Sequence, residues 1–86
     1  MNIEEHTIMV IEHFSGKLPT KFIEECRALA RHNEWGIALE NLCVQLCEYD
    51  VLPSVQELDE IRRLAGRVGI KEESLNFLVS PGSNNS

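Results

Sequence analysis

The chain has 86 residues, of which 8 are lysine or arginine and 14 are aspartate or glutamate, so its formal net charge at pH 7 is −6. A domain of this size buries only about 60 to 65 % of the surface of its unfolded chain, which leaves little room for an interior active-site cavity and favours a protein that works through its surface. The acidic balance disfavours nucleic acid and anionic membranes as direct partners and favours a basic protein.

The first predicted helix spans residues 2–14. Its apolar side chains recur with helical spacing and share one face, whose members are Ile3, Val10, Ile11 and Phe14. Glu4 and Glu5 suit the first turn, where the helix dipole is positive. Ser15-Gly16 is expected to end this helix.

The second predicted helix begins with Pro19 in its first turn, where a backbone N–H is not needed. The residues expected on its buried side are Phe22, Ile23, Cys26, Leu29 and Ala30. It should end near His32-Asn33, where a histidine cation would suit the negative end of the helix.

The third predicted helix is capped by Asn33 and ends at Tyr49-Asp50. The residues expected on its buried side are Trp35, Ala38, Leu39, Leu42 and Leu46, widened by Ile37, Cys43, Val44 and Cys47. A helix this apolar around its circumference should be central, with Trp35 in the core. The residues expected on a narrow ridge near solvent are Glu40, Asn41 and Glu48.

The fourth predicted helix has the clearest start, because Ser54 and Glu57 have the spacing of a capping box. The residues expected on its buried side are Val55, Leu58, Ile61, Leu64, Ala65 and Val68. On the opposite face, Asp59 and Arg63 are spaced for an i,i+4 ion pair. Gly69 should end the helix.

A short fifth helix is expected over residues 71–79, where it would add Leu75, Phe77 and Leu78 to the core, and residues 80–86 are expected to form a mobile tail. No segment alternates apolar and polar residues over a strand length, and no repeat of 20 to 50 residues is visible. Because the loops are short, neighbouring helices should be antiparallel. The predicted fold is all-α, a compact antiparallel bundle of four to five short helices forming one domain over residues 1–79.

The N-terminus and the cysteines favour a reducing compartment. Residues 1–6 lack the features of a secretory signal, and no apolar run is long enough to span a bilayer. The cysteines are three, an odd number. Cys43 and Cys47 on one helix would hold their Cβ atoms about 5 to 6 Å apart, whereas a disulfide needs about 3.5 to 4.5 Å. We therefore expect a cytoplasmic protein with reduced, mostly packed thiols.

No pattern in the sequence supports catalysis or a cofactor. Cys43 and Cys47 could present two thiolates on one helix face, but structural zinc normally needs four ligands and no second pair accompanies them. None of the histidines, His6, His13 and His32, forms a set with a nucleophile and an orienting group. No Gly-rich phosphate loop follows a strand. We expect a protein that is not an enzyme and holds no metal or cofactor.

The charged residues leave two surfaces to interpret. Arg62, Arg63 and Arg67 form a basic cluster that preceding acids on the same helix would pair with. The acids of the late third helix, its connection and the early fourth helix are Glu40, Glu48, Asp50, Glu57, Asp59 and Glu60. They would adjoin if the connection is a tight reversal, and they are equally consistent with ordinary solubilising charges. Tyr49 among them favours an interface, because aromatic anchors are typical of interfaces.

Residues 33–50 read NEWGIALENLCVQLCEYD and resemble the signature of MafI-type immunity proteins, whose core reads close to (G/N)EWGxALExLCxQLxEYD. IRRLAGRVGI at residues 61–70 and LNFL at residues 75–78 are similar to the family's downstream helix and ending, so the resemblance covers about residues 22–79. These motifs are structural, and they therefore identify relatives better than they identify a mechanism.

The resemblance implies a small cytoplasmic antidote that binds the C-terminal domain of a polymorphic or contact-dependent inhibition toxin, often a nuclease, and protects the producing bacterial cell. A nuclease attracts phosphates with lysine and arginine, so an acidic helical surface could cover its cleft. From the residues rather than from the family, we expect the toxin-binding surface to comprise Glu40, Glu48, Tyr49, Asp50, Glu57, Asp59 and Glu60.

Two other interpretations stay open at this point. The chain could be a helical adaptor or regulatory module that self-associates through its apolar third helix, with no toxin partner. It could also be a DNA-mimicking regulator of a nucleic-acid-binding protein, which would share the acidic surface but not the partner. The sequence leaves the oligomeric state and the activity of a cognate toxin undetermined.

Overall fold

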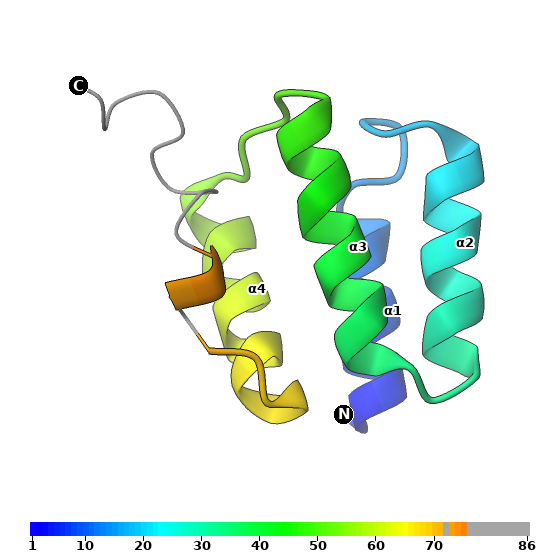
Figure 1. The fold of residues 1–86 in the computed structure, drawn as a ribbon, viewed down its shortest axis with the longest axis vertical. Helices are drawn as coiled ribbons and strands as arrows, with labels where there is room; N and C mark the ends of the chain where they lie inside the picture. The colour runs from blue at the N-terminus through cyan, green and yellow to red at the C-terminus, as the bar shows by residue number, and fades with distance from the viewer. Residues whose placement is uncertain (72, 76–86) are drawn as a thin grey trace.

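The computed structural model describes residues 1–71 and 73–75. It contains the helices α1 (Ile3–Glu12), α2 (Thr20–Arg31), α3 (Trp35–Glu48) and α4 (Val55–Val68). Consecutive helices run in opposite directions, with α3 at the front of the bundle, α1 behind it, and α2 and α4 on either side (Figure 1). The part of the chain that the structure describes has no strand, so the predicted all-α bundle is confirmed.

The helices enclose one apolar core. Both α1 and α3 contact all the other helices, whereas α2 and α4 do not contact each other within the described residues. The buried apolar residues are Val10, Ile11, Phe14, Leu18, Ile23, Cys26, Ala30, Ala38, Leu39, Leu42, Cys43, Leu46, Ile61, Leu64, Ala65 and Leu75. Phe14 is fully buried although α1 ends at Glu12, two residues before the predicted end.

Capping boxes begin α1 and α4. At α4, the Glu57 N–H donates to Ser54 Oγ at 3.1 Å and the Ser54 N–H donates to Glu57 Oε1 at 2.8 Å, as the sequence predicted. At α1, Asn2 precedes the helix instead of lying inside it, and its Oδ1 accepts the Glu5 N–H at 2.8 Å. Each box satisfies backbone donors that have no partner within the helix.

The assignment of Asn33 as the cap of α3 is wrong. Asn33 has φ +65°, and it closes α2 in a Schellman motif, in which the Glu34 N–H donates to the Leu29 carbonyl at 2.9 Å. Glu34 precedes α3 and makes no side-chain capping bond. Asparagine tolerates left-handed backbone better than most residues, which explains its place at this helix end.

The C-terminal ends of α3 and α4 use the same device. Asp50 has φ +55° after α3, and the Val51 N–H donates to the Leu46 carbonyl at 2.9 Å. Gly69 has φ +86° after α4, as expected for the glycine that ends that helix. Beyond it, Leu75 is buried in a short 3₁₀ turn at residues 73–75, while the rest of the expected fifth helix and tail, residue 72 and residues 76–86, lie outside the described residues.

Several side chains predicted to be buried lie on the surface. Ile37 is 46 % exposed, Val44 is 49 % exposed and Val55 is 86 % exposed, and Cys47 is exposed as well. Ile37, Val44 and Cys47 project from the side of α3 that α1, α2 and α4 leave exposed, and Val55 is the first residue of α4. Trp35 is only half-buried, although it packs against the core.

Candidate protein-binding surface

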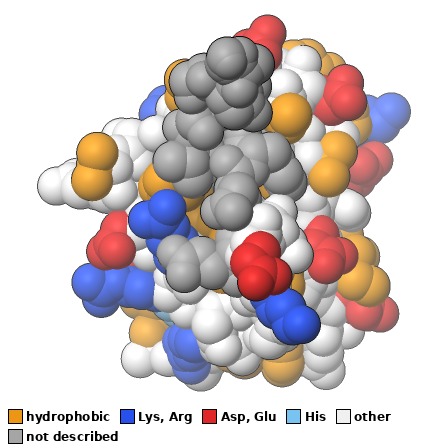
Figure 2. All heavy atoms as spheres, turned by 60° about the vertical axis from the view of Figure 1, so that its left-hand side comes forward, with side chains coloured by type: hydrophobic (Ala, Val, Ile, Leu, Met, Phe, Trp, Pro, Cys, Tyr) orange, Lys and Arg blue, Asp and Glu red, His pale blue; other side chains and the backbone are white. Residues whose placement is uncertain are grey.

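The exposed side of α3, here called the α3 face, consists of Ile37, Glu40, Asn41, Val44, Cys47 and Glu48. These residues recur every three or four positions and therefore form one stripe along the helix. The positions between them supply the core, because α3 packs on α1, α2 and α4 at once. Acidic and apolar side chains lie together along the right-hand margin of the view in Figure 2, the side to which α3 turns.

The carboxylates of the α3 face have no partner among the residues that the structure describes. Within residues 1–71 and 73–75, the side chains of Glu40 and Glu48 form no hydrogen bond or ion pair, and neither does that of Asp50 just after the helix. An exposed carboxylate without a cation beside it contributes its full charge to the field in front of the surface. The α3 face therefore offers a partner negative charge that no nearby cation among the described residues neutralises.

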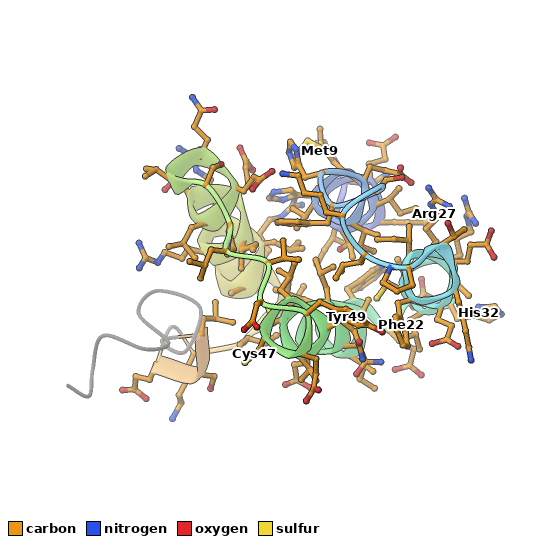
Figure 3. The ribbon with its side chains drawn as sticks, turned by 90° about the horizontal axis from the view of Figure 1, so that it is seen from above. Met9, Phe22, Arg27, His32, Cys47 and Tyr49 are labelled. Atoms are coloured by element: carbon orange, nitrogen blue, oxygen red, sulfur yellow. The ribbon has the colours of Figure 1, made fainter. Side chains whose placement is uncertain are left out.

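Tyr49 lies at the C-terminal end of α3 and is 50 % exposed. Its ring is tilted against that of Phe22 on α2, with the ring centroids 6.0 Å apart, and Figure 3 shows the two side chains meeting between the helices. The contact limits the motion of a large, partly apolar side chain at the surface, which is how interface aromatics reduce the entropy lost on binding.

The three remaining predicted residues, Glu57, Asp59 and Glu60, line a different surface. Together with Met9, His13, Ser54 and Gln56 they form a groove of about 530 Å³ between α1 and α4, here called the α4 groove. In Figure 3, Met9 lies on the side of the bundle opposite Cys47 and Tyr49. The structure thus divides the predicted site into an α3 group and an α4 group on two sides of the bundle.

Each acid of the α4 groove is already paired. Glu57 accepts from Lys17 Nζ at 3.1 Å, and Asp59 accepts from Arg63 Nε at the same distance. Burial alone would raise the pKa of Glu57, but its capping hydrogen bonds with Ser54 and the ammonium of Lys17 outweigh burial and lower the pKa from its usual value. Binding a cation there would compete with these internal contacts.

Glu60 belongs to a network that the sequence did not reveal. Arg67 Nη1 lies 3.1 Å from Nδ1 of the buried His6, and His6 Nε2 lies 3.3 Å from Glu60 Oε1. Because arginine can only donate, Nδ1 accepts and Nε2–H donates to the carboxylate. The network joins α1 to α4 across more than fifty residues of sequence, a separation over which no local pattern points to the contact.

The two buried thiols, Cys26 and Cys43, are not activated. Burial raises the pKa of Cys26 to about 11 and that of Cys43 to about 12, so both are protonated at neutral pH. No group of three or more metal-ligating side chains occurs in residues 1–71 and 73–75. In the same part of the chain no helix has the length and apolarity to cross a bilayer. The surface features described above are therefore the strongest candidates for a site.

No family model, curated protein or solved structure matches the chain. The likeness of residues 33–50 to the immunity-protein signature accordingly stays a prediction.

Proposed function

We propose that the chain is an immunity protein that binds the C-terminal toxin domain of a contact-dependent or polymorphic toxin and neutralises it. The observation that carries the proposal is a group of exposed carboxylates on α3 and just after it, Glu40, Glu48 and Asp50, which have no ion pair within residues 1–71 and 73–75. The half-exposed ring of Tyr49 lies at the C-terminal end of the same helix. Such a surface suits a basic protein partner, and the net charge of −6 favours the same kind of partner.

The proposed mechanism is occlusion of a basic cleft. A toxin domain that cleaves nucleic acid must hold phosphates with lysine and arginine, and carboxylates can take the place of those phosphates. Long-range attraction would speed the encounter, and the positions of the individual charges would fix the orientation of the bound proteins. The protein contributes no reaction of its own in this mechanism, because covering the cleft is sufficient.

A self-associating helical module is the second candidate. The observation that favours it is the exposure of Ile37 and Val44 on α3, since exposed apolar side chains can mark an interface between copies. This candidate predicts a stable homodimer and no affinity for a toxin domain. Sedimentation of the purified chain at micromolar concentration distinguishes it from the immunity proposal.

The direct test is co-expression with the toxin domain encoded beside this chain. The proposal predicts restored growth and a complex that co-purifies. Toxicity that persists without any complex would refute it.

Occlusion by charge requires a second measurement. Reversal of Glu48, Asp50 and Glu57 to lysine should abolish binding, but Glu57 also caps α4. The cleaner variant therefore reverses Glu40, Glu48 and Asp50, none of which has an internal partner among the described residues. Unchanged affinity of that variant would eliminate charge-based occlusion.

A further inference from the structure

We infer that the α3 face is the surface that contacts the toxin, with Ile37 and Val44 at its apolar centre, and that it receives a concave protein surface in which lysines and arginines surround an apolar patch. This inference rests on the proposed function and adds to it the contact surface and the chemistry of the partner. It also separates the α3 group of acids from the acids of the α4 groove.

The apolar centre consists of two side chains that lie about two helical turns apart on α3. Ile37 and Val44 are seven residues apart, which places them about 10 Å apart along the helix axis. Each leaves nearly half of its surface in water, at 46 % and 49 % exposed. Removing such side chains from water is the main favourable term in most protein associations. Leu52, 62 % exposed, adds apolar surface just beyond the end of α3.

Negative charge alternates with these apolar side chains. Glu40 lies one turn after Ile37 and one turn before Val44, and Glu48 lies one turn after Val44. A partner that covers the apolar centre must therefore bring cations against both carboxylates. Since neither carboxylate has a partner among the described residues, no contact within this part of the bundle is broken when the cations arrive.

The α4 groove is the weaker candidate because its acids already have partners. Each of its acids would have to exchange an existing partner for one on the toxin, and the partners are Lys17, Arg63 and His6. For Glu57 and Asp59 this replaces one ion pair by another, which gives little net free energy, and Glu60 would lose its hydrogen bond from the neutral His6. Among the described residues that line the groove, the one large apolar side chain is Met9, which is partly buried, whereas Ile37 and Val44 on the α3 face are exposed.

A second copy of the chain does not fit the α3 face. A two-fold antiparallel pairing centred on Val44 sets Glu40 near Glu48, and one centred between Ile37 and Val44 sets the two copies of Glu40 near each other across the axis. A parallel pairing sets each glutamate near its own copy, so carboxylates approach carboxylates in each of these arrangements. The face is also small and convex. The helix is about 21 Å long and about 10 Å wide, so the area of its exposed side is about 210 Å². This area is about a quarter of the roughly 800 Å² per partner that a stable interface buries. A concave cleft can cover the flanks of α3 as well.

Matched charge reversals test the inference in the full chain. The double variant Glu40→Lys/Glu48→Lys changes the α3 face, and Glu4→Lys/Glu24→Lys makes the same change in net charge on α1 and α2. By titration calorimetry with the purified toxin domain, we expect the first variant to bind about 100-fold more weakly and the second to stay within about 3-fold of the unmodified chain. Circular dichroism verifies that both variants keep their helices.

A second pair of variants tests the apolar centre of the α3 face. Ile37→Ser/Val44→Ser should weaken binding by about 10-fold or more, whereas Val55→Ser, at an apolar side chain that is 86 % exposed on α4, should not change it. Equal loss in the two charge variants, or no loss in Ile37→Ser/Val44→Ser, would overturn the inference while leaving the immunity function in place. Failure of the unmodified chain to bind the toxin domain would refute the proposed function itself.

Discussion

The orientation of α3 can be tested by comparing two alanine substitutions on that helix. Leu42 is fully buried, whereas Val44, two positions later, is 49 % exposed. Replacement of a buried leucine by alanine costs about 2 to 5 kcal/mol, because apolar contacts are lost and a cavity remains. For Val44→Ala the smaller loss of apolar contact is offset by the higher helix propensity of alanine, so the net change should stay within about 0.5 kcal/mol.

Urea and thermal denaturation followed by circular dichroism measure both effects. A domain of this size is stabilised by about 4 to 13 kcal/mol in total, and each kcal/mol lost lowers the Tm by about 4 to 8 °C. We therefore expect Leu42→Ala to lower the Tm by at least about 8 °C and Val44→Ala to leave it nearly unchanged. A loss of more than about 1.5 kcal/mol for Val44→Ala would show that Val44 is buried and would refute the α3 face.

Three further predictions concern the N-terminal cap of α4, the loss of stability at low pH and the accessibility of the thiols. Ser54→Ala removes half of the capping box of α4 and should cost about 1 kcal/mol in a urea titration; no change would contradict the box. The pKa of Glu57 is lowered in the folded state from an unfolded value near 4.5, so its contribution is present above that pH and is lost as the pH falls through the folded pKa. Glu57→Gln should therefore show a shallower loss of stability between about pH 5 and pH 3, and a slope equal to that of the unmodified chain would be contrary evidence. At pH 8, N-ethylmaleimide should label Cys47 alone in the native chain and all three cysteines in denaturant, as counted by mass spectrometry, because the other two are buried; a second native label would show that one of them is accessible.

Local patterns allowed most helix boundaries to be predicted. The capping box at Ser54 depends on residues three apart, so its sequence signal is complete. Asn33 was ambiguous, because asparagine favours both the N-cap of a helix and the left-handed residue that ends one. Which role it takes depends on the hydrogen bond from Glu34 back to Leu29, which involves the preceding helix as much as the following one.

The exposed side of α3 was predicted only in part: Glu40, Asn41 and Glu48 are exposed as expected, but Ile37, Val44 and Cys47 beside them were expected to be buried. Apolar residues surround the helix, so their periodicity does not select the stripe that meets solvent. That choice is made by the positions of α1, α2 and α4, which leave Ile37 and Val44 uncovered. The contact of His6 with Glu60 and Arg67 is likewise a product of the tertiary fold.

Protection of Cys47 tests the central claim most directly, because it needs no substitution. Cys47 lies on the α3 face and is exposed, while Cys26 and Cys43 are buried. Its alkylation rate is measured by mass spectrometry with and without a saturating amount of the purified toxin domain. We predict that alkylation slows by about 10-fold or more in the complex, because the partner excludes the reagent from the face. A complex in which Cys47 reacts as fast as in the free chain would contradict docking on α3.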